Sequence, residues 1–178
     1  MAKIKLIPIA PVNIGIVEQL VDPLQEQYSA VVEIDSKNSL KAETAFNPSR
    51  AQYNSSQLLL ELLSIGESFQ GKILGVTAVD LFIPVLTYVF GEAQLNGTVS
   101  IMSTYRLSET LYGLPENNSL LVERAIKEAV HELGHTFGLF HCRNYECAMH
   151  SSTSIEEVDI KGSQLCLECF QQLSAKLL

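Results

Sequence analysis

His131 to His141 reads HELGHTFGLFH, and this stretch decides how the rest of the chain is interpreted. His131 and His135 are one helical turn apart, so on a helix their imidazoles project from one face and can bind one metal ion. Gly138 is the residue type that most readily adopts the left-handed conformation that ends a helix. The resulting turn would bring His141 back as a third ligand. The pattern HExxHxxGxxH therefore predicts a zinc site with these three histidines as protein ligands.

An open ligand position and a neighbouring glutamate favour a catalytic rather than a structural zinc. Three protein ligands leave the fourth tetrahedral position for a water molecule. Glu132 directly follows the first histidine, so we expect it to act as the general base that takes a proton from that water. The alternative is a set of ordinary core histidines. It is disfavoured because five fixed positions match by chance in roughly one in ten thousand chains or fewer.

Four cysteines follow the histidine motif, and none precedes it: Cys142, Cys147, Cys166 and Cys169. Thiolates are soft ligands that suit zinc, and four of them would form a closed, structural site. The main alternative is redox chemistry or disulfides, because a CxxC motif at a helix start has a lowered thiol pKa. A further alternative is cysteines that only fill the core. We favour structural zinc, because Cys142 directly follows His141 and would link the two sites.

These motifs resemble the archaemetzincin family of the metzincin clan of zinc endopeptidases. The similar features are HExxHxxGxxHC from His131 to Cys142, then Cys147-Ala148-Met149, and the CxxC motif from Cys166 to Cys169. The resemblance implies a second, structural zinc held by the four cysteines, and therefore two Zn²⁺ ions per chain. It also implies that Met149 forms an apolar floor under the catalytic metal without binding it. We expect His150, the remaining histidine, to be a solvated loop residue.

Hydrophobic patterning predicts alternating strands and helices before the histidine motif. The expected strands are 4–9, 30–34, 72–79, 86–90 and 98–105, with Asn96-Gly97 as a hairpin turn between the last two. The expected helices are 14–28, with Pro23 as a kink or break, and one from Ser55 or Ser56 to Ile65. Residues 37–54 are polar and contain Pro48, which indicates a loop. This order favours a mainly parallel sheet with an antiparallel hairpin at its end.

The helix expected from Ser119 to Phe137 carries the first two histidines. Its apolar stripe should pack on the sheet, and it comprises Val122, Ile126, Ala129, Leu133 and Phe137. The histidines point to the opposite side, alongside Arg124, Lys127 and Glu128, and that side should face a cleft. Beyond Gly138 we expect little regular structure until a last helix over 163–177. Asp80, Glu92 and Arg106 near strand ends are interpreted as ordinary loop or surface charges and are left out of the site.

The predicted fold class is α+β and zincin-like, in a single domain of residues 1–178. A twisted, mixed five-stranded sheet and the active-site helix form an N-terminal subdomain, residues 1–138. A small zinc-clipped C-terminal subdomain follows, residues 139–178. The net charge of −8 argues against nucleic acid or an anionic membrane as partner. The start of the chain is interpreted as a buried strand rather than a signal peptide or propeptide, so we expect a cytoplasmic protein. We also expect a monomer.

The predicted function is a zinc metallopeptidase whose partners are peptide or protein substrates. Glu132 would activate the water, and the exposed edge strand 86–90 would pair with an extended substrate backbone, as the resemblance implies. One alternative is a catalytically quiet, zinc-containing peptide-binding module. The intact Glu132 argues against it, because binding alone needs no base. Another alternative is a thiol redox protein, in which the cysteines would titrate freely instead of holding metal.

Overall fold

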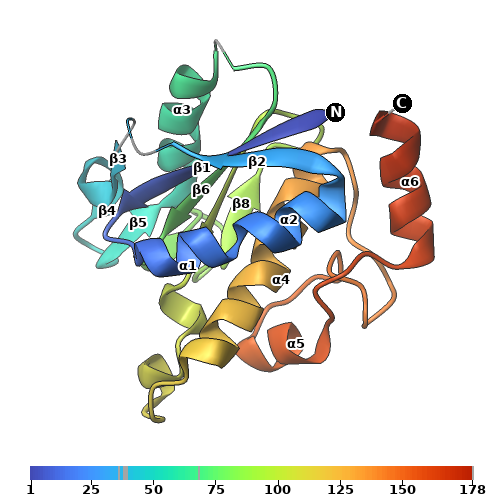
Figure 1. Cartoon of the computed structure of the whole chain (residues 1–178). Coiled ribbons are helices and arrows are strands. Elements are labelled where there is room, and N and C mark those ends of the chain that lie inside the picture. The colour runs from blue at the N-terminus through green and yellow to red at the C-terminus, as the bar shows by residue number, and fades with distance from the viewer. Residues whose placement is uncertain (36, 38–39, 68, 178) are drawn as a thin grey trace.

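The computed structural model describes residues 1–35, 37, 40–67 and 69–177, and a mixed sheet forms its centre (Figure 1). Four strands are parallel, and the edge strand β8 is antiparallel to its neighbour β9. In spatial order the strands are β2 (Ala30–Ile34), β1 (Ala2–Ala10), β6 (Lys72–Thr77), β9 (Val99–Ser103) and β8 (Gly91–Ala93). The short β3 (Leu40–Lys41) pairs with the end of β1. The predicted five-stranded mixed sheet is therefore present, with β3 added to it.

Helices cover both faces of the sheet, because side chains on both faces are apolar. One core contains Leu6, Leu74 and Met102 together with Leu133 of α4. Their neighbours along the strands form the core on the opposite face, with Leu62 of α3. The helices on the first side are α1 (Ile14–Gln19), α2 (Val21–Tyr28) and α4 (Asn118–Thr136), and α3 (Ser55–Gly66) packs on the other. This double covering is typical of parallel sheets.

A second, smaller sheet has two of its three strands in the stretch that was predicted to be a loop. Its strands are β4 (Phe46–Asn47), β5 (Gln52–Asn54) and β7 (Leu81–Phe82), and a 3₁₀ helix η1 (Ala42–Ala45) precedes them. The loop prediction for 37–54 is wrong over η1, β4 and β5, while its positions 38 and 39 lie outside the described residues. Strands of two or three residues are too short to show the alternation by which strands are recognised.

The strand predicted at 86–90 is also wrong. Within 86–90, Val89 forms only an isolated bridge with Leu81, and the antiparallel edge strand is β8, Gly91–Ala93. The hairpin prediction at Asn96-Gly97 is confirmed, since Gln94 N donates to Val99 O at 3.0 Å across the turn and Asn96 has a φ of 54°. An apolar run indicates burial more reliably than it indicates where backbone pairing begins.

The remaining boundaries differ by a few residues from those predicted. The helix expected over 14–28 is divided between α1 and α2 at Leu20, and Pro23 lies in the first turn of α2, where its missing N–H is tolerated. The short helix α5 (Ile155–Ile160) was not predicted, and α6 begins at Leu167 instead of Ser163. Two 3₁₀ helices, η2 (Tyr105–Leu107) and η3 (Glu109–Tyr112), lead from β9 towards α4.

Helix α4, which carries His131 and His135, is buried on more than its apolar side. Asn117 caps its start by accepting a hydrogen bond from Leu120 N at 3.1 Å. The histidine side of α4 faces a cleft, as predicted, and Glu128 lines that cleft too, but Arg124, Lys127 and Glu128 are almost fully buried. They are covered because Arg124 and Lys127 bond to Asp159, while Lys161 pairs with Glu128.

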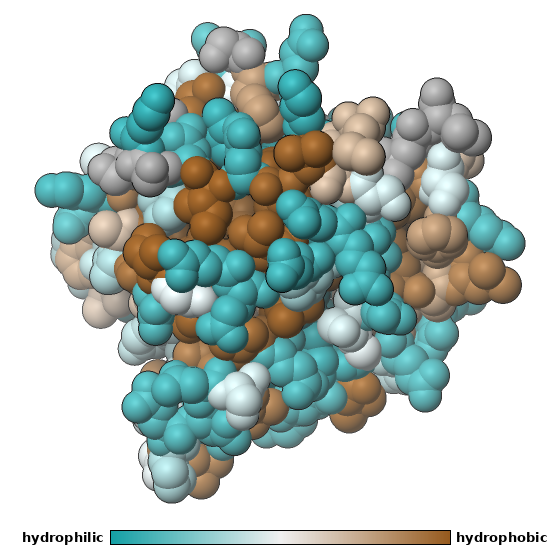
Figure 2. Space-filling view, viewed as in Figure 1, coloured by the Kyte–Doolittle hydropathy of each residue, from teal (hydrophilic) through white to brown (hydrophobic). Residues whose placement is uncertain are grey.

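The surface on the side shown in Figure 2 is mostly hydrophilic, with apolar groups between the polar ones. One such group lies at the start of α6, where Leu167 and Phe170 are 73% and 49% exposed. None of the described helices is long and apolar enough to cross a membrane.

Candidate active site and metal centres

The three histidines of the motif converge, and we call them the histidine cluster. His131 and His135 lie on α4, and Gly138 ends the helix turn with a φ of 81°, as predicted, which brings His141 back towards them. One ring nitrogen from each histidine lies within 4.8 Å of the others. The Nε2 atoms of His131 and His135 are 3.1 Å apart. Tetrahedral zinc with Zn–N bonds of about 2.0–2.1 Å places its nitrogens about 3.3 Å apart, so the donor set fits this metal.

Backbone carbonyls orient two of the imidazoles. His131 Nδ1 lies 2.8 Å from Ala148 O, and His135 Nδ1 lies 2.8 Å from Leu139 O. A carbonyl oxygen only accepts, so each Nδ1 carries the proton and each Nε2 presents its lone pair to the cluster centre. Burial lowers the pKa of all three histidines, and the charge of Lys161 adds to this effect. The rings are therefore held in the neutral form that binds metal.

The candidate base, Glu132, is buried beside the histidine cluster. Its carboxylate fits there because Gly91 of β8 has no side chain. Glu132 is 5% exposed, and burial raises the pKa of its carboxyl well above the usual range, with Glu128 adding to the rise and Lys161 opposing it. A Cβ atom placed on Gly91 would lie 2.5 Å from Glu132 Oε1. Only a glycine therefore leaves room for this carboxylate. Sequence reasoning missed Gly91, although its position at a strand end is a place where close approach is common.

Met149 lies against α4 at Gly134, next to the stretch that carries the histidines, which agrees with what the resemblance implies. It is fully buried, and an added Cβ at Gly134, between the two helical histidines, would collide with its sulfur. Its carbonyl accepts from Cys142 N at 2.9 Å, which closes the turn after the third histidine. His150 is not the solvated residue that we expected. It is half-buried, and its Nδ1 lies 2.9 Å from Cys142 O.

A buried ion pair lies next to the candidate base and was also missed. Lys161 is 1% exposed, and its Nζ is 2.8 Å from Glu128 Oε1, one helical turn before Glu132. The same ammonium donates to His150 O at 3.4 Å. The pair therefore joins α4 to the turn that carries Met149. The signal available in the sequence was weak, because a single lysine after a short helix is normally a surface residue.

The four cysteines also converge, and we call them the cysteine cluster. All four sulfurs lie within 4.8 Å of one another, and the cysteines are free thiols. Cys142 Sγ and Cys166 Sγ are 3.8 Å apart, which is the spacing of about 3.8 Å that tetrahedral Zn–S bonds of about 2.3 Å require. Cys147 Sγ accepts a hydrogen bond from Cys166 N at 3.3 Å. Burial raises the pKa of Cys147 and Cys169, so a cation is needed to hold all four as thiolates.

A cleft of about 600 Å³ lies in front of the histidine cluster. One side is formed by residues 86–93 and Leu95, the other by residues 151–153, and Glu128, His131, Glu132, His135, Phe140 and His141 also line it. Residues outside the predicted site occupy defined positions nearby. Asp80 and Arg106 form a two-bond ion pair at 2.6 and 2.7 Å, and Glu92 accepts hydrogen bonds from Ser55 and Ser56. Glu92 lines the cleft, whereas Asp80 and Arg106 do not, and none of the three was expected in the site.

Comparison with known proteins gives a consistent result. The family model described as Peptidase family M54 matches residues 12–175, a range that includes both clusters. The chain is 34% identical to an archaemetzincin of Thermococcus kodakarensis over 99% of this chain and 98% of that protein. It is 44% identical to an archaemetzincin of Methanocaldococcus jannaschii over 72% of this chain and 70% of that protein.

Solved structures of similar proteins share the fold over nearly the whole chain. A zinc-dependent peptidase from Methanocorpusculum labreanum superposes with a TM-score of 0.86 at 32% identity, covering 96% of this chain and 99% of that one. The archaemetzincin of Methanopyrus kandleri gives a TM-score of 0.81 at 34% identity, covering 99% of this chain and 95% of that one. The sheet, the active-site helix and the segment with the cysteines are thus parts of one shared architecture.

Proposed function

Because this chain belongs to peptidase family M54, the archaemetzincins, and is a zinc-dependent metallopeptidase, we propose that it hydrolyses peptide bonds at the histidine cluster with Glu132 as general base. The observation that carries the proposal is the convergence of three neutral imidazoles beside a buried carboxylate in one cleft. His131, His135 and His141 would hold the catalytic zinc. When bound, zinc lowers the pKa of a water to about 7 and polarises a carbonyl.

Glu132 has two tasks in this mechanism. It first takes the proton from the water that attacks the peptide carbonyl, and it then returns that proton to the leaving amine. Gly91 makes both transfers possible by leaving the space that the carboxylate occupies on the cleft side of β8. Lys161 and Glu128 hold the neighbouring turn of α4, so the base lies on a fixed element. These contacts leave the carboxylate little freedom to move away from the attacking water.

The edge of β8 is the proposed binding site for the substrate backbone. Within the described part of the chain, β8 pairs only with β9, so its other edge is unpaired. Ser103 N donates to Phe90 O at 2.8 Å, and Gln94 N donates to Val99 O at 3.0 Å. Along an antiparallel strand, successive residues direct their backbone N–H and C=O groups alternately to one neighbouring strand and to the other. Phe90 and Gln94 bond to β9, so Gly91 and Ala93 direct their backbone N–H and C=O groups to the unpaired edge. An extended peptide can add to this edge as a further strand.

We propose that a second zinc, bound by the cysteine cluster, makes residues 139–178 a clipped subdomain of a single catalytic domain. The cluster joins the irregular segment after α4, through Cys142 and Cys147, to the start of α6, through Cys166 and Cys169. The segment between them has little regular structure of its own. A closed metal site would therefore supply ordering free energy that this segment otherwise lacks. The net charge of −8 agrees with a peptide substrate and not with nucleic acid.

A diverse peptide library with mass-spectrometric detection tests the function. The protein as purified, the metal-free protein and the zinc-reconstituted protein are incubated with the same library. We expect cleavage that is lost on metal removal and restored by zinc. Equal cleavage by the metal-free protein would assign the hydrolysis to another site or another enzyme.

A further inference from the structure

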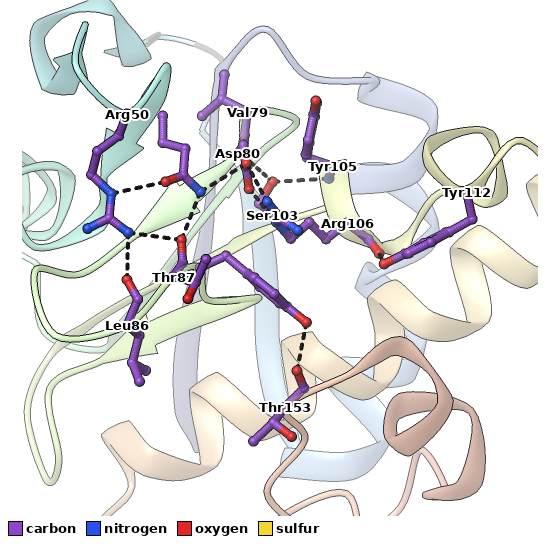
Figure 3. Close-up of polar contacts among 12 residues, drawn as sticks. Arg50, Val79, Asp80, Leu86, Thr87, Ser103, Tyr105, Arg106, Tyr112 and Thr153 are labelled. Atoms are coloured by element: carbon purple, nitrogen blue, oxygen red, sulfur yellow. Dashed lines mark hydrogen bonds and ion pairs between the residues drawn. The ribbon is translucent and has the colours of Figure 1, made fainter.

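The side of the cleft that precedes β8 in the chain is formed by residues 86–90, which we call the rim segment, and its backbone is held by polar side chains from elsewhere (Figure 3). Arg50 Nη2 donates to Leu86 O at 2.7 Å and to Thr87 O at 3.0 Å. Gln52 Nε2 also donates to Thr87 O, at 3.0 Å. These two carbonyls are therefore engaged within the protein. The rim segment is braced, although it is not a strand.

Tyr88, within the rim segment, is held by contacts with the side chains of Arg106 and Phe90. The guanidinium of Arg106 lies 3.9 Å from the centre of the Tyr88 ring, and two hydrogen bonds at 2.6 and 2.7 Å attach that guanidinium to Asp80. Phe90 contacts the ring edge-on, with 5.6 Å between ring centres. A tyrosine held by a stacked, paired arginine and a second ring has one defined position.

The hydroxyl of Tyr88 reaches the other side of the cleft. It donates to Thr153 O at 2.7 Å, and Figure 3 shows this bond to Thr153. Glu157 in turn fixes Thr153 by accepting hydrogen bonds from its backbone N and from Oγ1, at 2.5 and 2.9 Å. Tyr88 and Thr153 both line the cleft. The two walls are consequently joined at this end by a side chain that is braced on both sides.

The position of this bridge relative to β8 decides which part of a substrate it meets. A peptide that adds to β8 in the antiparallel sense, which gives the more stable ladder, runs from Ala93 towards Gly91. Its C-terminal part is then directed towards Tyr88, which precedes Gly91 in the chain. The bridge lies across the path of residues beyond the scissile bond.

We propose, on the basis of the function proposed above, that Tyr88 is a specificity-determining residue. Its ring and its bond to Thr153 close the cleft, so the protein selects peptides with little chain on the C-terminal side of the scissile bond. The ligand class is a peptide whose cleaved bond lies near its C-terminus. Arg106 and Asp80 are positioning residues, because they act only by holding the Tyr88 ring.

The test uses two peptides that share every residue up to the preferred scissile bond. One carries a single residue beyond it, and the other carries a long extension. The ratio of kcat/KM for the short peptide to that for the long one is measured for zinc-loaded wild type, Tyr88→Ala and Tyr88→Phe. We expect wild type to favour the short peptide by about tenfold to a hundredfold, the range that pocket closure supplies. Tyr88→Ala should bring the ratio close to one, and Tyr88→Phe should lie between.

Tyr112→Phe is the matched control, because its hydroxyl donates to Arg106 O at 2.9 Å and Tyr112 does not line the cleft. It should keep the wild-type ratio. Zinc-loaded Glu132→Gln protein provides a test without turnover. The ratio of the dissociation constants of the two peptides should show the same preference for the short one. An unchanged ratio in Tyr88→Ala, or a wild type that favours the long peptide, overturns the role of Tyr88 alone. If neither peptide is cleaved or bound by any of these proteins, the proposed function fails as well.

Discussion

The carboxylate of Glu132 occupies the space that a side chain on Gly91 would need, because a Cβ on Gly91 would lie 2.5 Å from the Oε1 atom of Glu132. The two residues come from the edge strand β8 and the active-site helix α4, so the relationship exists only in the folded chain. It couples the strand proposed to bind the substrate to the group proposed to activate the water. A change at either residue should therefore affect the chemical step.

Gly91→Ala should lower kcat by about a hundredfold, because displacing a catalytic group by about 1 Å has an effect of this size. Zinc content should stay at the wild-type value, since no ligand is changed. Steady-state kinetics and elemental analysis are the measurements. Gly15→Ala in α1 is a suitable control, because its Cβ would meet only the Asn13 side chain, at 3.3 Å. A wild-type kcat in Gly91→Ala would refute the steric role of Gly91.

Lys161→Met should reduce the free energy of unfolding by roughly 3–5 kcal/mol, because it leaves the buried carboxylate of Glu128 without its partner. The double variant Lys161→Met/Glu128→Leu should recover most of this loss, since both charges are removed together. Urea denaturation of the zinc-loaded proteins measures both values. If the double variant were as unstable as the single one, the loss would come from packing and not from an unpaired charge.

The two proposed zinc sites should differ in affinity. The cysteine cluster offers four sulfur ligands, whereas the histidine cluster offers three nitrogens and an exchangeable position. A mild chelator should therefore remove one equivalent first, abolish hydrolysis and leave most of the fold. Zinc analysis combined with circular dichroism follows both events.

Cys166→Ser extends this test to the link between the sites. Because Cys142 directly follows His141, loosening the cysteine cluster should weaken zinc binding at the histidine cluster too. Retention of two tightly bound zincs with normal melting would show that the cysteine cluster does not organise the catalytic half.

Zinc should stay in the histidine cluster below the pH at which ordinary histidines would release it. Protons compete with the metal for each Nε2, and free histidine titrates near about pH 6.5. Burial lowers the pKa of His131, His135 and His141, so protonation and zinc loss are shifted to lower pH. The measurement is zinc content and peptide hydrolysis over a pH series, and both should fall together. Half-release above pH 6.5 would contradict the three-histidine assignment.

The histidine cluster could be predicted from the sequence because its geometry is largely local, whereas the cysteine cluster was predicted from its residue types and from the resemblance. His131 and His135 share a helix face, and Gly138 supplies the turn that brings back His141. Met149 was singled out only because its place after His141 resembles the family's pattern. The parallel sheet could be predicted from apolar runs separated by helices. Strands that are covered on both faces are apolar along their whole length, so such runs indicate them.

The rest depended on contacts between segments that are distant in the sequence. Lys161 looked like a surface lysine because nothing near it in the chain reveals the buried Glu128. The rim segment looked like a strand because it is a short, mainly apolar run, yet Arg50 donates to its carbonyls and no neighbouring strand pairs with them. The role of Tyr88 depends on Thr153, on the opposite wall. Spacing along the chain does not encode such pairings.

Peptide hydrolysis by zinc-loaded Glu132→Gln protein tests the central claim most directly. The substitution keeps the size of the side chain and removes only the base, so zinc content and folding should be unchanged. Glu123→Gln is the matched control, because Glu123 is exposed on the same helix. We expect hydrolysis to fall by about 10²–10⁴-fold in Glu132→Gln and to remain at the wild-type rate in Glu123→Gln. Wild-type hydrolysis by zinc-loaded Glu132→Gln protein would contradict the account.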